Sequence, residues 1–201
     1  MSFNSFNLMQ LDALKEVGNI GSGNAATALS QLLNRKIDMN VPSINIISFQ
    51  DIFSSIGGED LVVGIIVRVL GDTPGSMLYV LDMGTALSII ESLTGEIGGE
   101  ISEMGDSVLR EIGNIISGSY LNAIAMLTNL LIIPSVPAVA TDMLGAILST
   151  TFIESGQYDD FVLDIESVFK QGENSEIIGG HFYFIPMPGS LEIILNKLGL
   201  E

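Results

Sequence analysis

The side chains best suited to chemistry stand in one short phrase that the chain carries twice. The phrase reads EVGNIGSGNAATA in the first half and EIGNIISGSYLNA in the second. Each copy places a glutamate and an asparagine three residues apart, Glu16 with Asn19 and Glu111 with Asn114. Residues at this spacing share one side of a helix, so each pair would act together. The carboxylate could serve as a base or pair with a cation, and the carboxamide could hold a water molecule.

Two familiar enzyme motifs fit the phrase poorly. Gly18, Gly21 and Gly23 suggest a glycine-rich phosphate loop, but no strand precedes them and their spacing matches neither the Walker nor the dinucleotide pattern. A hydrolase that used Glu16 as general base would need a nucleophile, a histidine or a metal cluster beside it. The single His181 lies in a predicted strand and is interpreted as structural. The remaining alternative is a plain solvated helix surface, because an exposed asparagine costs only about half a kcal/mol relative to alanine.

The phrase belongs to a duplication that spans the chain. An offset of 95 positions superposes the two phrases and extends as far as Pro42 on Pro137. Near the ends of the halves the best match has an offset of 104, with Tyr79 on Tyr183. The difference predicts an insertion of nine residues in the second half, which we place between residues 154 and 176. We therefore predict a single domain of residues 1–201, made of two repeats (about 1–95 and 100–201) with pseudo-twofold symmetry.

Both halves predict the same order of elements, and the fold class is α+β. Apolar periodicity and turn residues define these elements. The predicted elements are long helices at 10–34 and 105–129, a strand interrupted by proline at 37–47, short helices at 49–56 and 143–148, strands at 61–71, 75–82, 160–170 and 179–187, and closing helices at 85–93 and 190–198.

A helical wheel of the first long helix separates its residues into two sides. The stripe predicted to face the core holds Leu14, Val17, Gly21, Ala25, Ala28 and Leu32. The opposite side holds Asp12, Glu16, Asn19 and Gly23. We therefore expect the glutamate and the asparagine to point together into solvent.

Composition narrows the classes of function. The 201 residues carry a formal net charge of −17 with only seven Lys and Arg, so the surface repels phosphate backbones and anionic lipids. We expect no nucleic-acid partner and no role at a membrane surface. Without cysteine and with one histidine, the chain has no thiolate site and no histidine cluster for a metal, and we expect no cofactor of its own. No signal-peptide pattern is visible at the N-terminus, and we expect a cytoplasmic location.

Residues 112–141 form an uncharged run of 30 residues, which is long enough to cross a membrane. Asparagines and two prolines interrupt the run, and no cluster of Lys or Arg flanks it. We interpret it as a buried helix followed by a buried strand, without membrane insertion.

The repeated phrase resembles the signature of the CheC/CheX/FliY phosphatase family. That signature is Asp or Ser, three residues, Glu, two residues, Asn, then 22 residues and Pro. The first half matches it with Asp12, Glu16, Asn19 and Pro42. The second half matches it with Ser107, Glu111, Asn114 and Pro137. The duplicated layout extends the resemblance over essentially the whole chain.

This resemblance implies two long helices packed on an antiparallel β-sheet, and a chemotaxis phosphatase that hydrolyses the aspartyl phosphate of the response regulator CheY. It implies that Asn19 and Asn114 enter the regulator's active site and position the attacking water. Glu16 and Glu111 would pair with the regulator's lysine. The regulator would supply the Mg²⁺ ion together with that lysine, so the phosphatase needs no metal of its own.

The resemblance also implies a partnership with the receptor deamidase CheD, and binding to CheD is the alternative function. The predicted contact comprises Asp142, Met143, Leu144, Ile147 and Leu148, whose apolar members are equally consistent with the core. A fused repeat can replace a homodimer, so we expect a monomer. Both copies retain Glu and Asn, and their relative activity stays open.

Overall fold

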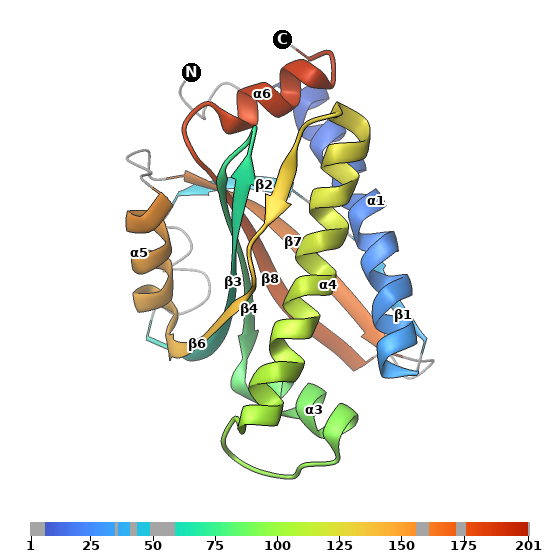
Figure 1. Ribbon diagram of the computed structural model, residues 1–201, viewed down its shortest axis with the longest axis vertical. Helices are drawn as coiled ribbons and strands as arrows, with labels where there is room; N and C mark the ends of the chain where they lie inside the picture. Colours follow the sequence, from blue (N-terminus) through green and yellow to red (C-terminus); the bar gives the residue numbers. More distant parts are fainter. Residues whose placement is uncertain are drawn as a thin grey trace.

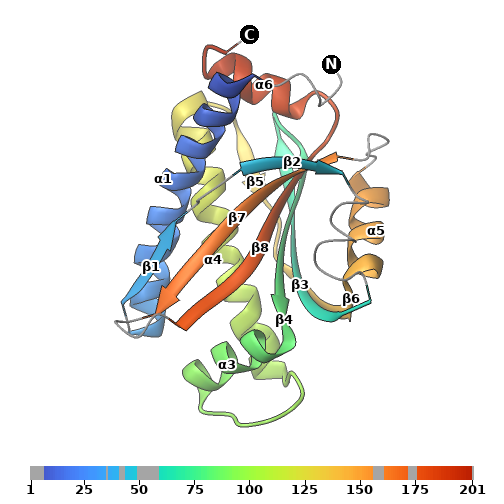
Figure 2. The same ribbon diagram turned by 180° about the vertical axis from the view of Figure 1, so that it is seen from behind.

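The computed structural model describes residues 7–34, 36–40, 44–48, 59–155, 161–171 and 176–200. Two long helices, α1 and α4, lie side by side on one face of an antiparallel sheet, and α5 lies on the other face (Figures 1 and 2). In chain order the elements are α1 (Leu8–Leu33), β1 (Ile37–Asn40), β2 (Ile44–Ser48), β3 (Leu61–Gly71), β4 (Gly75–Asp82), α3 (Met83–Thr94), α4 (Glu103–Thr128), β5 (Ile132–Pro134), β6 (Ala138–Met143), α5 (Leu144–Ser155), β7 (Phe161–Gln171), β8 (Glu176–Pro186) and α6 (Ser190–Lys197). The predicted α+β class is confirmed.

Side-chain caps set the ends of the two long helices. Asn7 accepts a hydrogen bond from the Gln10 N–H at 3.0 Å, and the Ser102 hydroxyl accepts one from the Gly105 N–H at 3.0 Å. At the other ends, Asn34 and Asn129 adopt left-handed conformations with φ of 48° and 56°. Both kinds of cap recur at the repeat offset of 95 positions. The predicted helix boundaries are correct to within two residues.

The sheet interleaves strands from the two halves. Its strand order is β1-β7-β8-β4-β3-β5, with β2 also paired to β7 and β6 also paired to β3. The first strands of one half therefore pair with the hairpin of the other half, and the reverse holds as well. When each strand is replaced by its counterpart in the other half, the same order is obtained from the opposite edge of the sheet. The pseudo-twofold axis therefore passes between β8 and β4.

The offset between the closing parts of the halves is 105 positions, and the predicted 104 is wrong. Tyr79 faces the core beneath α1 and α4, whereas Tyr183 faces α5. Successive side chains of a strand point to opposite faces, so these two tyrosines cannot be equivalent. In the closing helices an offset of 105 superposes the buried residues Ala86, Ile89 and Ile90 on Leu191, Ile194 and Leu195. The insertion in the second half is thus ten residues rather than nine.

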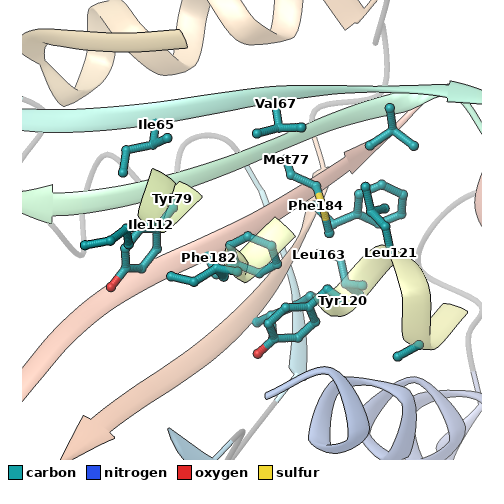
Figure 3. Close-up of a cluster of buried hydrophobic side chains, with 14 of the residues drawn as sticks. Ile65, Val67, Met77, Tyr79, Ile112, Tyr120, Leu121, Leu163, Phe182 and Phe184 are labelled. Carbon is teal, nitrogen blue, oxygen red and sulfur yellow. The ribbon is translucent and has the colours of Figure 1, made fainter. Parts of the chain in front are cut away.

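The larger part of the core lies between the sheet and the two long helices. Tyr120 of α4 meets Phe182 of β8 with ring centroids 4.7 Å apart (Figure 3). Strand β4 is buried on both faces, because α5 covers its reverse side. This double burial accounts for the almost unbroken apolar sequence of β4.

The helical wheel of α1 is wrong toward the end of the helix, where Ala28 is only half-buried. Leu32 is 37% exposed, and Leu29 is buried in its place. The Ser30 hydroxyl accepts a hydrogen bond from the Ile37 N–H at 2.9 Å, which holds β1 against the last turns of the helix. The buried side of α1 therefore turns toward β1 in the last turns of the helix. A helical wheel drawn from the sequence does not include this contact with β1.

Other predicted elements differ in extent. Helix α5 continues to Ser155, beyond the predicted end at 148, and β8 begins at Glu176 rather than 179. The strand predicted at 37–47 is divided into β1 and β2. The short helix predicted at 49–56 lies outside the described residues. The uncharged run is α4 followed by β5 and β6, and no helix within the described ranges could span a bilayer. The buried strand expected after the helix is wrong, because β5 and β6 are two short strands whose residues are mostly exposed.

Candidate functional site

The two glutamate–asparagine pairs lie on exposed helix surfaces. Glu16 and Asn19 of α1 are exposed, and so are Glu111 and Asn114 of α4. Each pair spans one turn and shares a face, as the spacing predicts. The expectation that both pairs are displayed to solvent is confirmed.

The first signature position lies one turn before each glutamate. Asp12 and Ser107 are both exposed, and the Ser107 hydroxyl donates to the Glu103 carbonyl oxygen of its own helix at 3.0 Å. Each side chain thus extends the exposed stripe of its helix by one turn.

The two pairs form separate sites on one outer surface. Helices α1 and α4 run antiparallel (Figures 1 and 2), and Gly21 lies directly against Tyr120. Because the helices are antiparallel, the residue two positions before Gly21 lies level with the residue two positions after Tyr120. Asn19 is therefore level with Asn122. With a rise of 1.5 Å per residue, Asn19 and Asn114 lie about 12 Å apart along the helix axes. One partner residue could not reach both asparagines at once.

The glycine inside the second phrase lets α4 approach the sheet. A β-carbon added at Gly113 would lie 2.3 Å from Cγ2 of Ile65 on β3 and 3.6 Å from Cβ of Pro137. Pro137, the last signature position, is buried against the helix next to Asn114. Gly113 and Pro137 therefore fix how far Asn114 stands out from the fold. The matching Pro42 lies outside the described residues.

Arg110 ties this part of α4 to the segment before β6. Its guanidinium donates to the Asp106 carboxylate at 2.5 Å and to the Pro137 carbonyl oxygen at 2.5 Å. The hydrogen bond to Asp106 raises the pKa of Arg110 above its ordinary value, so the group stays charged. The first half has Leu11 and Lys15 at these positions and lacks this ion pair. The only sign of this ion pair in the sequence is the spacing of Arg110 from Asp106, which is that of a helical pair.

The contact predicted for CheD is largely unavailable. Leu144, Ile147 and Leu148 are buried between α5 and the sheet, with exposures of 0%, 4% and 0%. They form core because α5 packs on the sheet with these side chains turned toward β3, β4 and β8. Asp142 and Met143, at the end of β6, are exposed. Only these two residues of the predicted contact can meet a partner.

The described part of the chain holds no cluster of three or more histidine or carboxylate side chains that could bind a metal ion. His181 stacks on Tyr183 with ring centroids 5.8 Å apart, on the sheet face opposite both pairs. It cannot take part in chemistry at either asparagine.

The chain is similar to known proteins. The sequence model of the CheC-like family matches residues 9–46 and 104–140, which contain both phrases. The chain is 40% identical to the CheY-P phosphatase CheC of Bacillus subtilis, over 98% of this chain and 97% of that protein. The chain belongs to the CheC-like family.

Other relatives show how widely this fold is shared. The CheC-like chain is 35% identical to the flagellar motor switch phosphatase FliY of B. subtilis, over 55% of this chain and 30% of that protein. Its structure matches the crystal structure of Thermotoga maritima FliY with a TM-score of 0.78 at 22% identity, covering 97% and 98% of the two chains. The expected arrangement of two long helices on an antiparallel sheet is thereby confirmed.

Proposed function

We propose that this chain is a phosphatase that hydrolyses the aspartyl phosphate of a CheY-type response regulator. The observation that carries the proposal is the exposed glutamate–asparagine pair on each long helix, in a chain 40% identical to a CheY-P phosphatase. Sites on convex helix surfaces suit a reaction that takes place inside another protein's active site. No substrate pocket of this chain's own is then needed.

Hydrolysis of an aspartyl phosphate requires few catalytic groups from the phosphatase. In an aspartyl phosphate the leaving group is a carboxylate, a weak base that departs without a general acid. A water oxygen forms a bond to phosphorus, the bond from phosphorus to the aspartyl oxygen breaks, and the water proton passes to the released phosphate or to solvent. The barrier falls when that water is held in line with the breaking bond.

Asn19 and Asn114 are suited to hold the water. A carboxamide both donates and accepts hydrogen bonds, and it carries no charge that would repel the phosphoryl group. Glu16 and Glu111, one turn earlier on the same face, would pair with the regulator's lysine and orient the two proteins. The Mg²⁺ ion and the lysine that neutralise the phosphoryl oxygens belong to the regulator.

The test is the loss of phosphate from a phosphorylated regulator with the wild type, Asn19→Ala, Asn114→Ala and the double variant. We expect the wild type to accelerate the loss, each single variant to keep the rate of its intact site, and the double variant to return to the regulator's own rate. Asn196→Ala, at an exposed position of α6, is the matched control and should behave as wild type.

A wild type that leaves the decay unchanged, even with CheD present, would defeat the proposal.

Binding to CheD is the second candidate function, and one observation favours it. Met143 pairs in register with Leu61, and the two apolar side chains are 49% and 57% exposed. A separate binding measurement tests this candidate, and the double asparagine variant should still bind CheD. Because one chain holds both sites, we further propose that it acts as a monomer.

A further inference from the structure

Two glycines on the exposed side of the long helices have no role in the fold. Gly23 of α1 is exposed and Gly118 of α4 is half-exposed. A β-carbon added at either position would meet no atom within 4 Å. A glycine inside a helix is less favourable than alanine by about 1 kcal/mol. Both positions therefore carry a cost that packing within the chain does not explain.

Other glycines of the same helices show the contrast. A β-carbon at Gly21 would lie 2.9 Å from Cα of Tyr120, so α4 could not approach α1 as closely. The counterpart of Gly21 in the second half is nevertheless Ile116. Gly113, which matches Gly18, is kept in both copies and packs against Ile65. Gly23 and Gly118 are also kept in both copies, but without any such contact.

The two glycines lie beside the proposed reaction sites. Each follows its asparagine by four residues, so Gly23 shares an exposed face with Asn19 and Gly118 shares one with Asn114. Two residues beyond the contact of Gly21 with Tyr120, Gly23 comes level with Gly118 on the antiparallel partner helix. Each glycine therefore leaves bare backbone one turn from its asparagine, on the exposed side of its own helix.

We propose that Gly23 and Gly118 are positioning residues, against which the surface of the regulator next to its phosphoryl group packs directly. The inference rests on the proposed function. An asparagine side chain is short, so its amide reaches a water beside phosphorus only if the regulator comes into contact with the helix. A side chain as long as asparagine, placed one turn away on the same face, would hold the two surfaces apart.

The test measures binding and turnover separately. The dissociation constant is measured with a CheY-type regulator loaded with beryllofluoride, a stable mimic of the aspartyl phosphate, for the wild type, Gly23→Gln, Gly118→Gln and the double variant. Turnover is measured with the phosphorylated regulator. Thr150→Gln, an enlargement at an exposed position of α5 on the opposite sheet face, is the matched control.

We expect the double variant to bind about tenfold more weakly or worse, with KM raised and kcat at saturation lowered as well, because a regulator held away from the helix leaves the asparagine amide short of the water. Thermal unfolding should show the glutamine variants at least as stable as wild type, because glutamine favours helix over glycine. A structural role would lower stability instead and overturn the proposal.

The other possible outcomes separate this inference from the proposed function. Unchanged dissociation constants in a wild type that turns over would overturn this inference and leave the proposed function intact. A wild type that binds but does not turn over would defeat the proposed function, while the glycine variants still test the contact. A wild type that does not bind the loaded regulator would overturn both.

Discussion

At the residue scale, the repeated phrase contains both exposed and buried positions. Glu111 and Asn114 face solvent, whereas Gly113 between them presses against Ile65 of β3. A helix surface can display an exposed pair at a fixed height only if its inner side is held at a fixed distance from the sheet. The glycine in the phrase is thus a packing residue, although it stands next to the asparagine in sequence.

Gly113→Ala is expected to destabilise the protein by about 1–3 kcal/mol, the range for adding a methyl group to a well-packed core. The added β-carbon would lie 2.3 Å from Cγ2 of Ile65, so α4 or β3 must shift. Denaturant unfolding of Gly113→Ala, Ile65→Ala and the double variant measures the effect.

The double variant should be more stable than the sum of the two single losses predicts, because Ile65→Ala removes the atom that the new methyl group meets. Strict additivity would show that the alanine acts elsewhere. Gly118→Ala serves as the control, since nothing lies within 4 Å of a β-carbon there.

At the element scale, helices begin where a side chain can accept the free backbone N–H groups. Asp82 ends β4 and caps α3, where its carboxylate accepts from the Thr85 N–H at 2.8 Å and from the Thr85 hydroxyl at 2.6 Å. Partial burial by itself would raise the pKa of Asp82, but the hydrogen bonds from Thr85 outweigh it and leave the pKa lowered. The cap is therefore strongest when Asp82 is ionised.

Asp82→Ala is expected to cost about 1 kcal/mol of stability at neutral pH, as other lost caps do. Because the folded pKa lies below the unfolded value of about 3.9, the ionic part is complete above about pH 5 and is lost as the pH falls through the folded pKa. Urea unfolding at pH 7 and at pH 3 checks this. The difference between wild type and Asp82→Ala should shrink at pH 3, whereas the difference between Asp82→Asn and Asp82→Ala, which both lack the charge, should not depend on pH. An equal loss at both pH values would contradict a role of the charge.

At the scale of the whole molecule, the two repeats are joined by their sheet. Strands β1 and β2 of the first half pair with β7 of the second, and β5 and β6 of the second half pair with β3 of the first. Each half alone would leave its hairpin without the strands that cover its outer edge. We infer that the halves fold as one unit, despite the two copies in the sequence.

Thermal unfolding should accordingly be one cooperative transition, with equal calorimetric and van't Hoff enthalpies. Leu109→Ala in the second half and Leu29→Ala in the first remove buried side chains and should each lower the same transition. Two separate transitions, each sensitive to only one of these substitutions, would show that the halves are independent domains.

Much of the fold can be predicted from the sequence, because helix and strand periodicity are local. The two long helices, the hairpin strands and the exposure of Asn19 and Asn114 follow from the spacing of apolar residues along short segments. The repeat offset of 95 positions is equally visible in the sequence. Local pattern therefore determined which elements form and which face of each long helix carries the pairs.

The tertiary structure decided what depends on neighbours distant in the chain. The contact of β1 with α1 exposes Leu32, and the alternation of strand faces changes the second offset to 105. The fold also buries Leu144 and brings the Pro137 carbonyl to Arg110. No short segment encodes these contacts, since each depends on the free energy of packing the whole sheet against its helices. For the same reason Gly113 and Gly118, indistinguishable in sequence, differ once their surroundings are known.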